Sequence, residues 1–105
     1  MIVELRTYTF SPLVIKSFLE LYTARGHALH RRHLGQLVGY YTTEIGELGE
    51  VVQLWAFEDF ADRTRRREAL WKDSEWLAFC AESPAPLAMH SRILQPTSFS
   101  PQHIA

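Results

Sequence analysis

Residues 37–57, LVGYYTTEIGELGEVVQLWAF, hold two segments rich in β-branched and aromatic side chains around a short glycine-containing connection. Such side chains favour strands, and Gly46 and Gly49 are typical of the turn between them. A connection this short joins antiparallel neighbours. The stretch therefore predicts a β-hairpin with strands over 37–45 and 51–57, and the segments on either side of it decide which fold contains it.

A strand and a helix are expected before the hairpin. Residues 2–10, IVELRTYTF, alternate with period 2, which is typical of a strand. Ser11 and Pro12 then favour a helix start, because serine caps free backbone N–H groups and proline fits the first turn. The helical pattern continues to a C-cap at Gly35, and Gly26 is expected to interrupt it.

Two short helices and a last strand are expected after the hairpin. Asp59 and Asp73 are placed to cap the helices, and two prolines end the helical stretch. These elements are expected over residues 60–71, 74–82 and 87–94. The tail, 96–105, is expected to be extended.

The predicted order is β-α-β-β-α-β, with the second helical region split in two. This is the pattern of an α+β, ferredoxin-like fold, in which four antiparallel strands carry helices on one face. A length of 105 residues corresponds to a single domain, residues 1–105.

Composition excludes several classes of function. The formal net charge is −1, so the overall balance favours neither nucleic acid nor an anionic membrane as a partner. Cys80 is the only cysteine and cannot form an internal disulfide, and the start of the chain does not look like a signal peptide. We therefore expect a cytoplasmic protein. No phosphate loop, dinucleotide fingerprint or zinc spacing is present, so no cofactor and no metal is expected.

Both faces of the predicted sheet are apolar or aromatic. Val52 and Leu54 share one face of the third strand, while Trp55 and Phe57 share the other. Helices can cover only one face, and a wet apolar face of this size is unfavourable. The simplest cover is a second copy related by a two-fold axis, which predicts a homodimeric barrel whose lumen is lined by the helix-free faces.

The expected ligand site is this lumen. Its candidate residues are Glu4, Arg6, Tyr8, Gln53, Trp55 and Arg92. Arg6 would hold an anionic or carbonyl group, Glu4 would orient it or act as a base, and Tyr8 and Trp55 would form apolar walls. The alternative is a structural ion pair between Glu4 and Arg6 that fixes the dimer register. Tyr40 and Tyr41 must point to opposite faces, and the sequence does not show which of them faces the lumen.

Four histidines are weaker candidates. His27, His30 and His33 recur every third residue, but the outer two diverge around a helix, so cations near a helix end are favoured over metal ligands. His90 lies in the last predicted strand and is a candidate acid or base without a visible partner.

The arginine-rich segment 63–67 offers a basic surface. Acidic residues are interleaved with it, and a pair between Asp62 and Arg66 at i,i+4 is available, so a solvated helix face is favoured over nucleic-acid binding. Cys80 stands among large apolar residues and is interpreted as a buried structural thiol.

Several blocks together resemble the NIPSNAP family. These blocks are VELRTYTF, RRHLGQLVGYYTTEIGELGEVVQLWAF, DRTRRREAL, DSEW and SRILQPTSFSP, in order from residue 2 to about residue 101. The resemblance implies a dimeric α/β-barrel fold and little about chemistry. Barrels of similar architecture include cofactor-free oxygenases, haem-degrading enzymes and small isomerases, which is an analogy of fold alone.

Two main hypotheses of function follow. In the first, a homodimer binds a small, partly apolar molecule in the lumen. In the second, the protein is a cofactor-free monooxygenase-like or isomerase-like enzyme, in which the lumen excludes water and a charged residue moves a proton. The first is favoured, because no base has an evident orienting partner. A protein-interaction module that uses the arginine-rich helix is a third hypothesis.

Overall fold

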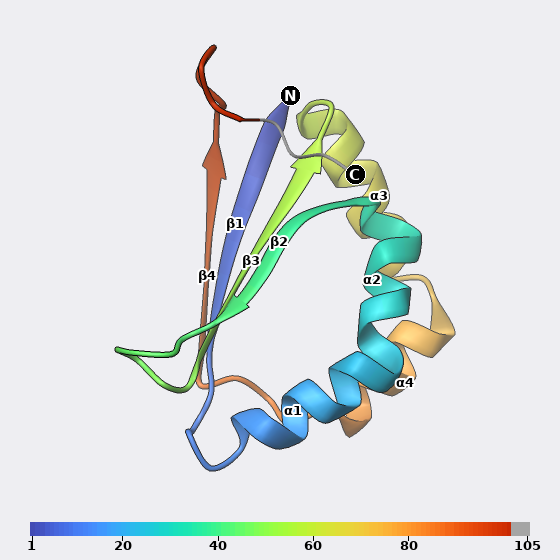
Figure 1. The fold of residues 1–105 in the computed structure, drawn as a ribbon. Helices are drawn as coiled ribbons and strands as arrows, with labels where there is room; N and C mark the ends of the chain where they lie inside the picture. Colours follow the sequence, from blue (N-terminus) through green and yellow to red (C-terminus); the bar gives the residue numbers. More distant parts are fainter. Residues whose placement is uncertain (102–105) are drawn as a thin grey trace.

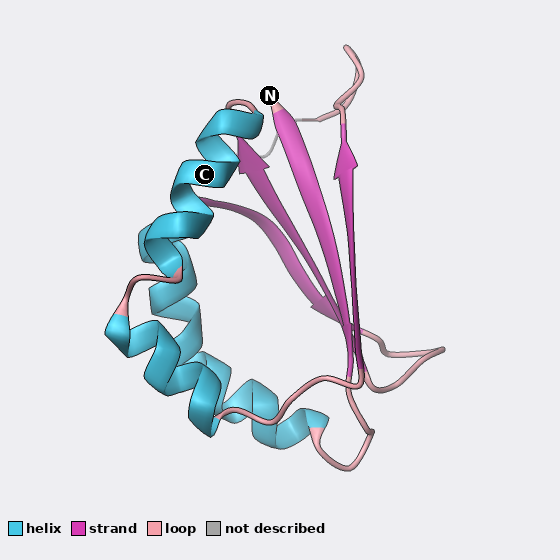
Figure 2. Cartoon of the chain, turned by 180° about the vertical axis from the view of Figure 1, so that it is seen from behind, coloured by secondary structure: helices cyan, strands magenta, loops and turns pink. Residues whose placement is uncertain are grey.

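The fold of the computed structural model, which describes residues 1–101, is a four-stranded antiparallel sheet with all helices on one side (Figures 1 and 2). The strand order is β2-β3-β1-β4. The elements are β1 (Ile2–Thr9), α1 (Ile15–Leu21), η1 (Tyr22–Gly26), α2 (His27–Leu34), β2 (Gln36–Thr42), β3 (Glu50–Phe57), α3 (Phe60–Leu70), α4 (Ser74–Glu82) and β4 (Ala88–Leu94). This confirms the predicted ferredoxin-like α+β fold.

Local chemistry sets most element boundaries as expected. The Asp59 carboxylate accepts from the backbone N–H of Asp62 at 2.8 Å, and that of Asp73 from the N–H of Glu75 at 2.9 Å, so both predicted caps are confirmed. The first helix begins later than predicted, at Ile15. The N–H of Val14 donates to the carbonyl of Ser11 at 2.9 Å, which closes a turn before the helix starts.

The predicted hairpin is confirmed, with β2 ending at Thr42 rather than at residue 45. The loop of the hairpin contacts the residue that follows β1, because the carbonyl of Gly49 accepts from the N–H of Phe10 at 2.7 Å. A Cβ at Gly49 would lie 1.9 Å from the Phe10 carbonyl oxygen, so only glycine allows this approach.

The register places the polar side chains of the central strands under the helices. Arg6 of β1 stands opposite Gln53 of β3 and Ser91 of β4. Every second residue of each strand, counted from these three, points to the same side of the sheet, which is the helix side. On this helix face, Glu4 and Trp55 are 1% and 0% exposed, so they belong to the core between sheet and helices. The prediction that Glu4, Arg6, Tyr8, Gln53 and Trp55 lie on the helix-free face is therefore wrong.

The helix-free side of the sheet, called the open face below, carries the smaller apolar residues. It includes Val3, Leu5, Thr7, Tyr41, Val52, Leu54, His90, Arg92 and Leu94. Arg92 is paired with Leu5, so it lies on the side of the sheet opposite Glu4 and Arg6. Tyr40 is paired with Gln53 on the helix face, and Tyr41, which is 55% exposed, is on the open face.

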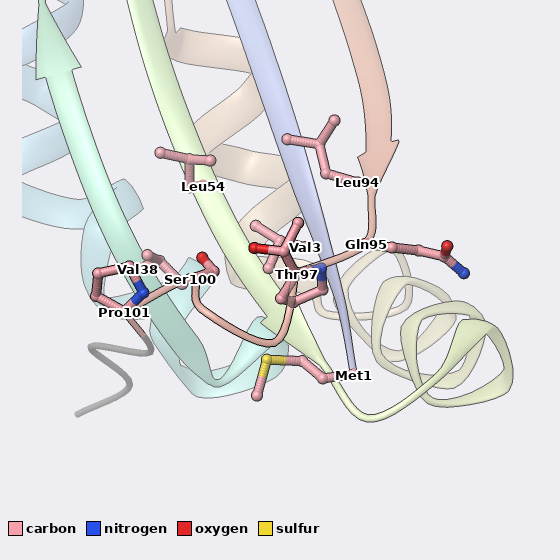
Figure 3. A pocket seen from close by; sticks show the side chains of 10 residues that line it. Met1, Val3, Val38, Leu54, Leu94, Gln95, Thr97, Ser100 and Pro101 are labelled. Carbon is pink, nitrogen blue, oxygen red and sulfur yellow. The ribbon is translucent and has the colours of Figure 1, made fainter.

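The C-terminal segment 96–101 crosses one end of the open face (Figure 3). With Val3, Leu54 and Leu94 it encloses a shallow pocket of about 290 Å³. The segment is not fully extended as predicted, because the N–H of Ser100 donates to the carbonyl of Thr97 in a turn. The rest of the predicted tail, 102–105, lies outside the described residues.

None of the helices within residues 1–101 is long and apolar enough to cross a lipid bilayer.

Candidate functional site

A cavity of about 230 Å³ lies between the helix face of the sheet and the helices, and we call it the helix-side cavity. Its aromatic walls are Phe10, Phe18, Tyr22, Trp71, Trp76 and Phe79. Trp71 and Met89 are 48% and 52% exposed, so the cavity reaches the surface beside them. Pockets for drug-sized ligands are about 300–1,000 Å³, so this cavity suits a smaller molecule.

Glu4 is the centre of a buried ion network behind the cavity. One carboxylate oxygen, Oε2, accepts from Arg6 Nη1 at 3.0 Å, from Arg63 Nη2 at 2.9 Å and from the hydroxyl of Ser91, while Oε1 accepts from Arg63 Nε at 3.0 Å. Burial raises the pKa of this carboxyl, but the bonds from Arg63 and Ser91 and the charges of Arg6 and Arg63 lower it to about 2. Glu4 is thus held as an anion at neutral pH by bonds from three residues, so it is not placed to act as a base.

Arg6 connects this network to the cavity. Its Nη1 donates to Glu4, and its Nε donates to the Tyr8 hydroxyl at 3.2 Å. Both Arg6 and Tyr8 line the cavity, and Nη2 of Arg6 takes no part in these bonds. The guanidinium is therefore held from one side and can still donate on the other.

Arg67 is the second cation in the cavity wall. It lies on the same face of α3 as Arg63, one helical turn further along, and it is half-buried. Within residues 1–101 its guanidinium makes no hydrogen bond or ion pair. Burial and the neighbouring charges of Arg6 and Arg63 lower the pKa of Arg67, and the opposing effects of Glu4 and Tyr8 do not offset this.

His30 faces the same cavity from α2 and is only 3% exposed. Its Nδ1 lies 2.7 Å from the hydroxyl of Tyr22, which leaves Nε2 as the ring nitrogen outside this bond. Burial, with the charges of Arg6 and Arg67, lowers the pKa of His30 to about 3. Burial also raises the pKa of Tyr22, so this is a pair of neutral groups at physiological pH.

A π-helical turn, η1, presents Tyr22 to the cavity. This turn, Tyr22–Gly26, forms the interruption that Gly26 predicted, and π-turns of this kind are frequent at functional sites. A Cβ at Gly26 would lie 2.6 Å from Phe79 Cζ and 2.7 Å from Tyr22 Cδ1. Glycine therefore lets two cavity walls meet at the π-turn.

Some buried polar atoms around the cavity lack partners among residues 1–101. These atoms are Tyr40 Oη, Gln53 Nε2 and Trp76 Nε1. Of these residues, Trp76 itself lines the cavity. A buried donor without an acceptor is unfavourable by about 1–3 kcal/mol. In addition to Arg67, the Trp76 indole N–H is therefore an unsatisfied donor of a residue that lines the cavity.

The structure separates the predicted site residues into three groups. Arg6 and Tyr8 line the helix-side cavity. Gln53 and Trp55 are buried in the core, where the Trp55 indole donates to Gln53 Oε1 at 2.6 Å, and Glu4 lies behind the cavity wall. Arg92 is on the open face and joins neither group.

The three helical histidines have three different environments. His30 is buried as described, whereas Nε2 of His33 lies 2.7 Å from Asp73 Oδ2 on the surface. His27 is exposed, and His90 stands on the open face. Among residues 1–101 no cluster of three or more potential metal ligands is found.

The arginine-rich helix is only partly a solvated face. Arg66 Nε pairs with Asp62 at 2.9 Å, as predicted, and Arg65 joins it at 3.2 Å. The interpretation of this helix as a solvated face is wrong for Arg63 and Arg67, because Arg63 binds Glu4 and Arg67 lines the cavity. The helical period puts positions 63 and 67 toward the sheet, a signal that the run of like charges conceals.

Cys80 lines the cavity from α4 and is half-buried. Burial raises the pKa of its thiol, so it is a neutral wall residue.

Matches to known proteins cover nearly the whole chain. The family model described as NIPSNAP matches residues 3–101. The chain belongs to the NIPSNAP family. Protein NipSnap homolog 3A of Homo sapiens is 39% identical over 70% of this chain, and Protein NipSnap of Drosophila melanogaster is 32% identical over 95% of it. The chain spans only 29% and 36% of the lengths of these two curated relatives.

Solved NIPSNAP structures have the same fold. Protein Atu4242 from Agrobacterium tumefaciens has a TM-score of 0.92 and 36% identity, over 96% of this chain and 98% of that one. A NIPSNAP-like domain protein from Burkholderia xenovorans has a TM-score of 0.91 and 41% identity, over 96% of this chain and 89% of that one. An antibiotic biosynthesis monooxygenase has a TM-score of 0.64 over 92% of this chain and 99% of its own, but at 12% identity it shares the fold alone.

Proposed function

We propose that this NIPSNAP-family protein binds a small, partly apolar molecule, and that the site is the helix-side cavity. The observation that supports this proposal is the cavity itself. It offers about 230 Å³ of space with aromatic walls, and a few polar residues, Arg6, Arg67 and His30, line it. Largely apolar cavities with few convergent polar groups are the usual form of a small-molecule site. This places the ligand on the other side of the sheet from the lumen that the sequence predicts.

A catalytic role has one observation in its favour, the bond between Tyr22 and His30 inside the cavity. A general base works best when its pKa is near the operating pH. The pKa of His30 is lowered to about 3, and Glu4 is fully engaged, so neither is suited to take a proton. These features favour binding over catalysis.

We also propose a homodimer formed through the open face. Val3, Leu5, Val52 and Leu54 form an apolar surface there that no helix of residues 1–101 covers. An identical surface on a second copy, turned by a two-fold axis, would cover it. The dimer would leave the helix-side cavity free, because the two sites lie on opposite sides of the sheet. A single cysteine, with no internal disulfide, suits the cytoplasm that the sequence predicts.

Native mass spectrometry of the purified protein tests the binding proposal. We expect a small-molecule adduct on the native protein that is lost in Cys80→Phe, which fills the cavity. Ala81→Phe, at the exposed neighbouring position, is the matched control and should keep the adduct. An adduct that survives Cys80→Phe would place the ligand elsewhere, and a native protein that retains and accepts no small molecule would contradict the proposal.

A further inference from the structure

The charges around the helix-side cavity do not balance. Arg6 and Arg63 pair with one carboxylate, that of Glu4, and Arg67 lines the cavity in addition, while no aspartate or glutamate is among the residues that line it. Glu4 already accepts bonds from Arg6, Arg63 and Ser91. Within residues 1–101 Arg67 makes no bond to it.

Three residues that line the cavity carry donors without a partner. The Arg67 guanidinium, Nη2 of Arg6 and the indole N–H of Trp76 have no acceptor within residues 1–101. A cation that is half-buried without a partner is unfavourable, and natural proteins keep such groups where a ligand uses them. The missing partner is an acceptor with negative charge.

The rest of the wall defines the body of the ligand. Trp76 and Phe79 stack with ring centroids 5.2 Å apart, and Tyr22 meets Phe79 edge-on at 6.2 Å. Flat aromatic walls favour an aromatic or otherwise planar apolar group, which gains offset-stacked and edge contacts. The cavity volume, about 230 Å³, limits that group to a size well below that of a drug-like molecule.

We propose that the ligand is a small aromatic carboxylate, with its ring against Trp76 and Phe79 and its carboxylate on the guanidinium of Arg67. This inference rests on the proposed binding function and names the class of ligand. A planar carboxylate matches the fork of an arginine and forms a bidentate ion pair with it, whereas a neutral amide offers one acceptor oxygen and no charge. Arg6, on β1, donates to the same carboxylate oxygens through Nη2.

The test compares two probes of the same shape by calorimetric titration, trans-cinnamate and the neutral trans-cinnamamide. We expect the acid to bind at least about tenfold more tightly, which corresponds to about 1.4 kcal/mol. Arg67→Gln should remove this preference, so that the acid and the amide bind the variant with similar affinity. Arg67→Lys should keep part of it. Arg31→Gln removes the same charge from an exposed position of α2 and should change nothing.

The results of these titrations distinguish an error in the ligand class or in the role of Arg67 from an error in the binding function. Equal binding of acid and amide would overturn the anionic ligand and leave the binding cavity in place. A preference for the acid that survives Arg67→Gln would overturn the assignment of Arg67. If neither probe binds, the aromatic carboxylate is overturned, and the adduct that Cys80→Phe should remove decides separately whether the binding function stands.

A second readout needs no ligand. If Arg67 is kept for an anion, the unliganded Arg67→Gln protein should melt at a higher temperature than the native protein, because an uncompensated cation is removed. A lower melting temperature than native would show that Arg67 holds the fold together, and would overturn its role as a ligand residue.

Discussion

Arg63 on α3 binds both carboxylate oxygens of Glu4 on β1: Nε lies 3.0 Å from Oε1, and Nη2 lies 2.9 Å from Oε2. Residues far apart in the sequence thus form a bidentate ion pair in the interior, and Arg6 completes it at 3.0 Å. The pair joins a helix to the centre of the sheet. The Glu4–Arg6 pair that the sequence indicates therefore exists, but it lies on the helix face, away from the surface that would form the dimer.

Glu4→Gln should lower the free energy of unfolding by about 3 kcal/mol, because removal of one partner leaves buried charge uncompensated. The folded pKa of Glu4, about 2, is below the unfolded value of 4.5, so its stabilising effect is complete above pH 4.5 and is lost toward pH 2. Urea titrations over this range should show a weaker pH dependence in the variant. Glu82→Gln, on an exposed pair with Arg25, is the control and should cost less than about 1 kcal/mol. Equal acid sensitivity of native protein and Glu4→Gln would contradict this prediction.

His30 should make the fold sensitive to mild acid. Its pKa is lowered from 6.5 to about 3 in the folded protein, so below pH 6.5 the unfolded chain binds a proton that the folded chain rejects. The contribution of His30 to the free energy of unfolding is fully present above pH 6.5 and is lost as the pH drops toward 3. The loss should reach about 2 kcal/mol near pH 5. In His30→Gln the slope between these pH values should be smaller, as measured by urea unfolding, and an unchanged slope would show that His30 titrates normally.

Gly26→Ala should destabilise the protein although alanine is the better helix former. The new methyl group would lie 2.6 Å from Phe79 Cζ, and overpacking of this kind costs about 1–3 kcal/mol, against a gain of about 1 kcal/mol from helix propensity. Thermal unfolding followed by circular dichroism should show a lower melting temperature. A rise in melting temperature would mean that Phe79 and Tyr22 can move apart without penalty.

Leu54→Asp should separate the proposed dimer, because it places a charge at the centre of the open face. Light scattering after size exclusion should give twice the chain mass for the native protein and the chain mass for the variant. Ile45→Asp, at a loop position that is 93% exposed, should remain dimeric. A native protein of single chain mass, or a Leu54→Asp protein of double mass, would refute this interface.

Most of the fold was predictable because its signals are local. Caps at Asp59 and Asp73, the interruption at Gly26 and the hairpin are set by neighbouring residues. The choice of face was not predictable in this way. Glu4 and Arg6 look too polar for a core, and the groups that compensate Glu4 there, Arg63 on α3 and Ser91 on β4, are distant in the sequence.

The candidate site was only partly predictable for the same reason. Arg6 and Tyr8 were identified by their alternation in a strand, and both line the cavity. Tyr22 was missed, and His30 and Arg67 were assigned to a helix end and a basic surface, since no local pattern shows that three separate helical segments converge on one space. A helical projection of 63–67 would have placed Arg63 and Arg67 together.

The proposed ligand site is tested first by titrating ¹⁵N-labelled protein with trans-cinnamate and following the three tryptophan indole N–H signals and the backbone amides. We expect the signals of Trp71 and Trp76, which line the helix-side cavity, to shift more than that of Trp55, which is buried in its bond to Gln53. The amides of Leu5 and Leu54 on the open face should stay in place. Shifts centred on those amides, or no shift of any indole, would contradict a ligand site between the sheet and the helices.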